Sequence, residues 1–145
     1  MTEMNKNSSQ PVQNDTSAGK DKVRSTELAR LAISALEDKK AEDVRVIDIE
    51  EVSVLADYFI IATGNNRTQV QAMADEVEMR LGKAGAAPRQ IEGYQAANWI
   101  LLDFGDVIVH VFDRDNRLLY DLQRIWNDGK QIEVQSLKDL AAEKE

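Results

Sequence analysis

The chain has 145 residues, of which 43% are hydrophobic, and this length supports one compact domain with little room for a second core. It contains no cysteine and one histidine, His110. This excludes disulfides, thiolate metal sites and a cysteine nucleophile, and it leaves few routes to histidine-assisted catalysis. The formal net charge of −8 repels nucleic-acid phosphates, so a basic protein is a better partner than bare RNA.

The N-terminal segment is polar and contains no aromatic side chain, which predicts a disordered tail over residues 1–24. This segment is slightly positive, so the rest of the chain carries a net charge of about −9. It lacks the apolar stretch of a secretory signal, and no apolar run in the chain approaches the roughly 20 residues that span a bilayer. We therefore expect a cytoplasmic protein with no membrane contact.

A first amphipathic helix is predicted from Ser25, with Thr26 as its candidate N-cap and the charged Asp38 near its end. Its apolar residues at helical spacing are Leu28, Leu31, Ala32, Ala35 and Leu36. Two strands follow this helix. Residues 44–50 carry β-branched side chains on both faces, and residues 57–63 form a nearly continuous apolar run that predicts a buried central strand.

A turn at Gly64-Asn65-Asn66 leads into a second helix, which either Asn66 or Thr68 can cap. The apolar stripe of this helix consists of Val70, Met73, Ala74, Val77 and Leu81. The residues that end it are Gly82, Gly85 and Pro88.

The second half of the chain is predicted to hold a hairpin and a last helix. Residues 98–104 and 107–112 are joined by Gly105-Asp106, which favours a β-hairpin. The last helix runs from about Asn116 to Gly129, and the charged residues 131–145 form a C-terminal tail that frays or adds a short helix. Because short strands need a covering layer, the predicted fold class is α/β, of the α+β kind: a mixed β-sheet covered by helices, over residues 25–130.

Two places in this fold are candidates for chemistry. Asp48 and Glu50 lie on the same face of a strand, and such a carboxylate pair can hold a divalent metal for nucleotidyl transfer. The residues before Asp48 lack a phosphate-binding glycine loop, which favours an ordinary solvated strand face. The turn from Thr63 to Thr68 could present backbone amides to an anion, but it lacks the glycines of a nucleotide fingerprint. We therefore predict no catalytic, cofactor or metal site.

The single histidine, His110, alternates with Ile108 and Phe112 on the second hairpin strand. It could act as a general base only if a carboxylate and a substrate met it there, so a structural histidine is the favoured interpretation. Residues 113–116 are interpreted as a strand end and a helix cap.

The first hairpin strand has two apolar faces, although helices can leave one face of a sheet uncovered. The residues of the two faces are Trp99, Leu101 and Asp103, and Ile100, Leu102 and Phe104. One face is therefore a candidate binding surface. Core packing of Trp99 is the alternative, because tryptophan is common both in cores and at interface hot spots.

The chain also resembles a known family, the ribosomal silencing factors or Iojap-like proteins, over about Leu28 to Asp128. The similarity rests on five blocks in the family's order and spacing. They are ADYFIIATGN at 56–65, Gln69-Val70 with Ala74-Asp75, Glu92-Gly93, WILLDFGDVIVHVF at 99–112 and RLLYDLQRIW at 117–126. The departures are small: Asn66 and Arg67 stand where the family has small polar residues, and the N-terminal tail is long.

The resemblance implies a fold like that of nucleotidyltransferases, without their catalytic signature. It also implies a non-catalytic protein that binds the fourteenth ribosomal protein of the large subunit, where the small subunit would dock. Such binding sterically blocks subunit joining and represses translation, with little direct nucleic-acid contact. Together with the second hairpin face, the resemblance points to Trp99, Leu101, Asp103 and Tyr120 as partner-binding residues.

Two alternative functions stay open at this point: a large-subunit assembly factor, and a nucleotidyltransferase that uses Asp48 and Glu50. The sequence also leaves open whether the free protein forms a homodimer.

Overall fold

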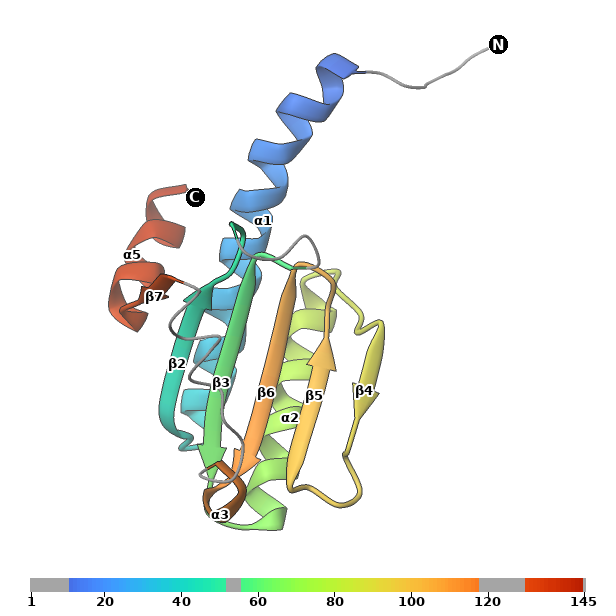
Figure 1. The fold of residues 1–145 in the computed structure, drawn as a ribbon, viewed down its shortest axis with the longest axis vertical. Helices are drawn as coiled ribbons and strands as arrows, with labels where there is room; N and C mark the ends of the chain where they lie inside the picture. The colour runs from blue at the N-terminus through green and yellow to red at the C-terminus, as the bar shows by residue number, and fades with distance from the viewer. Residues whose placement is uncertain (1–10, 52–55, 118–129, 145) are drawn as a thin grey trace.

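The computed structural model describes residues 11–51, 56–117 and 130–144. Within these residues, six strands form one mixed sheet in the order β4-β5-β6-β3-β2-β7, with helices packed against it (Figure 1). This confirms the predicted mixed sheet covered by helices. The bounds are α1 Pro11–Asp38, β2 Glu42–Asp48, β3 Tyr58–Gly64, α2 Arg67–Lys83, β4 Gln90–Glu92, β5 Trp99–Asp103, β6 Val107–Asp113, α3 Arg114–Arg117, β7 Lys130–Ile132 and α5 Val134–Lys144.

Strand β3 lies in the interior of the sheet, as its apolar run predicts. It pairs in parallel with β6 and antiparallel with β2, so Ile60 lies between Val109 and Val46. Parallel neighbours need a crossover connection, and the chain from β3 to β6 passes through α2 on the way. Buried positions run from Ile60 to the end of the strand.

The predicted hairpin is confirmed in strands β5 and β6. The two strands pair antiparallel, with Trp99 opposite Phe112 and Leu101 opposite His110. The connecting turn holds Gly105 at a φ of +91°, a left-handed conformation that glycine adopts without strain. The sequence therefore identified both the strands and the residue that turns the chain between them.

Helix α2 also begins where the sequence indicates. The Asn66 side chain accepts a hydrogen bond from the backbone N–H of Gln69 at 2.8 Å, so Asn66 is the N-cap and Thr68 lies inside the helix. Gly64 brings the helix close to β3, since a Cβ there would lie 2.8 Å from the Val70 Cγ2 atom. The whole predicted stripe is buried: Val70, Met73, Ala74, Val77 and Leu81.

The predicted start of the first helix is wrong, because α1 begins at Pro11 and not at Ser25. Residues 11–24 are therefore helical and not part of a disordered tail, while residues 1–10 lie outside the described residues. Thr26 is not a cap: its hydroxyl donates to the Lys22 carbonyl at 2.8 Å and lies 2.9 Å from the Tyr58 hydroxyl. A helix that packing has already nucleated can extend into polar sequence at little further cost, and proline is well tolerated in a first turn.

The predicted domain boundary at residue 130 also needs correction. Strand β7 pairs with β2, with Ile132 beside Val46, and Leu137 of α5 is fully buried in the main core. The alternative of a short added helix is thus the correct one, and this helix belongs to the fold. The contacts of β7 and α5 were not predicted from the sequence, because residues 131–145 contain only a few apolar residues among many charged ones. The predicted helix from Asn116 to Gly129 is described only at its start, where α3 ends at Arg117.

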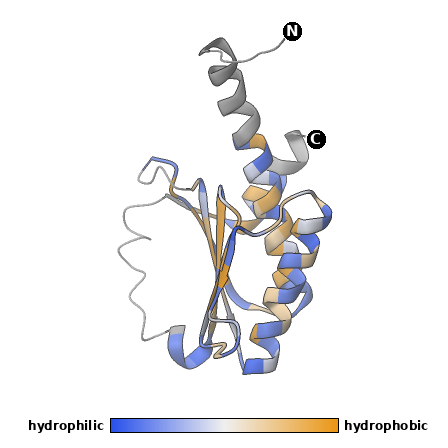
Figure 2. Cartoon of the chain, turned by 90° about the vertical axis from the view of Figure 1, so that its right-hand side faces the viewer, coloured by the Kyte–Doolittle hydropathy of each residue, from blue (hydrophilic) through white to orange (hydrophobic). Residues whose placement is uncertain are grey.

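Alternate strand residues separate two apolar clusters on the two faces of the sheet. The main cluster lies under α1 and α2, and it includes Ile60, Ile100 and Val109. Figure 2 shows the sheet edge-on, with α1 and α2 together on one side of it. The second cluster lies on the opposite face: Ile47, Ile49, Ala56, Ile61 and Phe112 are buried, and Phe59, Trp99 and Ile108 are partly buried. Among the described helices, none is long and apolar enough to cross a membrane.

Candidate functional site

Strand β5 places Trp99, Leu101 and Asp103 on the face opposite α1 and α2. All three side chains are partly buried, whereas Ile100 and Leu102 point into the main core and are fully buried. The two-faced strand predicted from the sequence is therefore confirmed as a matter of geometry. Tyr120, the fourth predicted partner-binding residue, lies outside the described residues.

Trp99 is the centre of an aromatic group on this face. Its ring stacks on Phe112 of the neighbouring strand at a centroid distance of 5.2 Å and lies 5.8 Å from the His110 ring. Phe59 of β3 meets His110 edge-on at 4.8 Å. Trp99 thus packs against its neighbours and keeps part of its surface exposed, so it combines features of the core and the binding-surface interpretations.

His110 is 5% exposed and lies inside this aromatic group. Its Nδ1 atom accepts a hydrogen bond from the Trp99 Nε1–H at 3.0 Å. Burial away from water lowers the pKa of His110 from 6.5 to about 4, so the ring is neutral at pH 7. This environment agrees with the structural histidine favoured from the sequence.

Asp103 is fixed at the end of β5 by the hairpin turn. One of its carboxylate oxygens accepts the backbone N–H of Gly105 at 2.8 Å. At the other end of the strand, Gly93 has a φ of +80°, and a Cβ there would lie 2.2 Å from the Trp99 carbonyl oxygen. A backbone approach this close requires glycine, and it helps to set the position of Trp99.

Sequence reasoning did not connect Phe59 and Ile108 with this surface. Each lies on a strand whose alternation was visible, but nothing local indicates that β3 is the parallel neighbour of β6. That pairing places Phe59 beside Ile108 and two residues from His110 in register. The period-two pattern could have suggested the residues, but only the strand order brings them together.

The candidate metal pair Asp48 and Glu50 is engaged by a cation of the chain itself. Lys22 of α1 forms ion pairs with Asp48 at 3.2 Å and with Glu50 at 3.4 Å. The Asp48 carboxylate also accepts the backbone N–H of Glu50 at 3.0 Å. In the described part of the chain, no group of three or more acidic or histidine side chains could hold a metal ion. These contacts favour a structural role for the pair.

The turn between β3 and α2 is likewise occupied by the chain's own side chains. The Asn66 side chain accepts a hydrogen bond from the backbone N–H of Gln69, and the Gln69 side chain accepts one from the backbone N–H of Asn65 at 2.7 Å. The Asn65 side chain in turn contacts Arg114, which also pairs with Glu42. Backbone amides that already have acceptors are poor ligands for an anion, so the geometry favours an ordinary capped turn.

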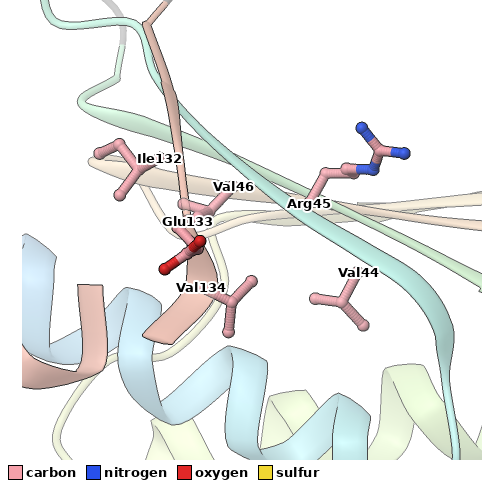
Figure 3. A pocket seen from close by; sticks show the side chains of 6 residues that line it. All are labelled: Val44, Arg45, Val46, Ile132, Glu133 and Val134. Atoms are coloured by element: carbon pink, nitrogen blue, oxygen red, sulfur yellow. The ribbon is translucent and has the colours of Figure 1, made fainter. Parts of the chain in front are cut away.

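A hollow of about 300 Å³ lies where the chain leaves β7 and turns into α5, beside β2. Four of its six lining residues are aliphatic, and Figure 3 shows the Arg45 side chain extending away from the other five. A site for a small molecule usually combines an apolar wall with several convergent polar groups, which this hollow lacks. The lining residues are Val44, Arg45, Val46, Ile132, Glu133 and Val134.

Together, these features define a sheet-based protein with helices on one face and a partly exposed aromatic surface on the other. Residues 22–145 match the family model described as ribosomal silencing factor during starvation. The chain belongs to this family, as the sequence resemblance indicates.

The similarity extends to individual proteins. Ribosomal silencing factor RsfS of Halalkalibacterium halodurans is 41% identical over 111 residues, which cover 77% of this chain and 95% of that protein. A crystal structure of a protein from Chromobacterium violaceum superposes with a TM-score of 0.69 at 38% identity, over 71% of this chain and 86% of the other. A more distant relative is the mouse protein named mitochondrial assembly of ribosomal large subunit protein 1, which is 28% identical over 99 residues, or 66% of this chain and 43% of that protein.

Proposed function

We propose that this protein binds the large ribosomal subunit through its fourteenth ribosomal protein and so blocks the docking of the small subunit. The observation that carries the proposal is the surface of Trp99, Leu101 and Asp103, in a chain that belongs to the ribosomal silencing factors. The bulk of the bound domain is sufficient to prevent subunit joining, and no bond is made or broken. The proposed action takes place in the cytoplasm, with no membrane contact.

The partly exposed aromatic group supports this docking surface. Interfaces concentrate their binding energy in a few aromatic or arginine anchors that partner side chains surround. Trp99 provides such an anchor, and Leu101 and Ile108 supply apolar surface around it. Asp103 adds an acidic group at the edge, held in place by the Gly105 amide.

The charge of the protein supports a basic partner. Its net charge is −8, whereas ribosomal proteins that contact RNA are generally basic. Complementary charge mainly accelerates association, and salt screens it over a Debye length of about 8 Å at physiological ionic strength. We therefore expect the association rate with large subunits to fall as salt is raised, with a smaller change in the dissociation rate.

The first experiment measures binding of purified Trp99→Ala to large ribosomal subunits. Loss of an interface anchor commonly costs about 2 kcal/mol or more, which is roughly thirtyfold in affinity. Met79→Ala is the matched control, because Met79 is a 46% exposed hydrophobic residue on α2, behind the other face of the sheet. It should bind like the parent protein.

Trp99→Ala also removes contacts with Phe112 and His110, so folding must be measured alongside binding. If Trp99 acted only as core, the substitution would lower the free energy of unfolding by about 3–5 kcal/mol, and weak binding would report unfolding alone. Leu101→Ser provides a second test with less loss of packing. Folded Trp99→Ala and Leu101→Ser variants that both bind like the parent would rule out this surface.

A second experiment distinguishes silencing from assembly. The name of the mouse relative concerns assembly of the large subunit, which favours a role in maturation as the second candidate function. Purified mature subunits are mixed with and without the protein and separated on sucrose gradients. Steric silencing predicts fewer joined ribosomes, whereas an unchanged profile would favour the assembly role.

A further inference from the structure

The burial of His110 among apolar side chains lowers the stability of the folded protein. It is 5% exposed among Phe59, Trp99 and Phe112, and its Nε2 atom is buried with no hydrogen-bond partner among the described residues. A buried polar atom without a partner lowers the stability of the folded protein, because it has lost its hydrogen bonds to water. A leucine or phenylalanine would fill an apolar site of this kind without that penalty. The presence of a histidine here is therefore best explained by what its other ring nitrogen, Nδ1, does.

The other ring nitrogen, Nδ1, accepts the hydrogen bond from the Trp99 indole. An indole N–H can only donate, so the Nδ1 atom at 3.0 Å must be unprotonated. The neutral ring therefore carries its proton on Nε2, the atom without a partner. A pKa of about 4 keeps this arrangement intact across the neutral pH range. A neutral histidine offers a ring nitrogen as an in-plane acceptor, which phenylalanine at this position would lack.

We propose that His110 is a positioning residue that holds the Trp99 indole in the orientation that the binding partner meets. The inference rests on the proposed function, because it assumes that Trp99 is an anchor. The hydrogen bond to Nδ1 fixes the rotation of the indole, and the stack on Phe112 at an interplanar angle of 25° fixes its plane. An anchor that is ordered before binding loses less conformational freedom on binding.

The expected effect on affinity follows from that ordering. Immobilising a side chain at an interface costs about 0.5–1.5 kcal/mol, so removal of the acceptor should weaken binding by about two- to thirteenfold. His110→Phe is the appropriate substitution, because it keeps an aromatic ring in the cluster and removes the acceptor for the Trp99 indole, together with the Nε2 atom that has no partner among the described residues. His110→Asn is the complementary variant, because its side-chain oxygen can accept a hydrogen bond at the same δ position while the ring is lost.

The first measurement is made on the free full-length protein and does not depend on the ribosome. The chain has one histidine and two tryptophans, so nitrogen-15 NMR of the side chains can be assigned with Trp126→Phe. We expect an unprotonated Nδ1, a protonated Nε2 and a Trp99 indole N–H signal that moves in His110→Phe. A histidine with its proton on Nδ1 would overturn the proposal while leaving the proposed function intact.

The second measurement is a double-mutant cycle on binding to purified large subunits. His110→Phe should weaken binding about two- to thirteenfold in the parent protein and have no further effect in a Trp99→Phe background. If His110→Phe does not fold, His110→Asn is measured in its place. Binding and a Trp99 indole N–H signal like those of the parent would then support the positioning role of His110. Equal losses in both backgrounds would show that His110 does not act through Trp99. If folded Trp99→Ala and Leu101→Ser also bind like the parent, the proposed docking surface itself fails, so the two failures are distinguishable.

Discussion

The burial of His110 predicts a pH dependence of stability that can be isolated with one substitution. Its pKa is lowered from 6.5 to about 4 in the folded protein because the charged ring would be desolvated. The unfolded chain therefore binds a proton near pH 6.5, and the folded chain binds it only near pH 4. The free energy of unfolding from this group is highest above pH 6.5 and falls as the pH drops from 6.5 to 4.

The magnitude follows from the size of the pKa shift. One pKa unit corresponds to 1.36 kcal/mol, so the full loss between pH 7 and pH 4 is about 3 kcal/mol. Between pH 7 and pH 5.5 the loss is about 1 kcal/mol, and this range stays above the sequence pI of 4.7. Urea unfolding of the parent and of His110→Phe at several pH values measures it, since the difference between the two proteins cancels all other titrating groups.

The free energy of unfolding of the parent minus that of His110→Phe should fall by about 1 kcal/mol between pH 7 and pH 5.5, because only the parent loses stability through His110. Two curves that run parallel from pH 7 to pH 5.5 would contradict the buried, neutral histidine. Direct titration by NMR gives an independent value, because the chain has one histidine. A His110 that titrates near pH 6.5 in the folded protein would refute the reasoning at its first step.

Four further substitutions test the fold. Gly64→Ala should lower the free energy of unfolding by about 1–3 kcal/mol, because the added Cβ would lie 2.8 Å from Val70 Cγ2. Gly82→Ala should raise the free energy of unfolding by about 0.5–1 kcal/mol, because a Cβ at this helical position would have no atom within 4 Å. Asn66→Ala should lower it by about 1 kcal/mol through loss of the α2 cap, as measured by urea unfolding. Leu137→Ala should lower it by about 2–5 kcal/mol, and an unchanged value would contradict the packing of α5 on the core.

The proposed docking surface has a buried base and a partly exposed outer layer. Ile61 and Phe112 are fully buried and provide a firm base, while Phe59, Trp99 and Ile108 lie at its outer side. A rigid base and a hydrogen-bonded anchor reduce the conformational freedom that remains to be lost on binding. Under the proposed function, this face contributes both to folding and to recognition, so binding and stability must be measured together for every variant.

Much of the fold follows from local periodicity in the sequence. The alternation in residues 99–103 assigned Ile100 and Leu102 to one face and Trp99 and Leu101 to the other, because side chains in a strand alternate with period two. The stripe of α2 and its Asn66 cap follow from helical spacing and from the chemistry of the first turn. These features depend on residues close together in the chain.

Tertiary structure alone decided which distant residues meet. The parallel pairing of β3 with β6 sets Phe59 beside Ile108, and β7 joins β2 across more than 80 residues of chain. The Trp99–His110 hydrogen bond likewise depends on the hairpin register, which sets Trp99 opposite Phe112 and next to His110. The start of α1 at Pro11 and the burial of Leu137 were not predicted, because both segments were judged by their polar composition as a whole. A few contacts with the core can be enough to order a largely polar segment. Sequence periodicity determines the face on which a side chain lies, and only the order and register of the strands determine its neighbours.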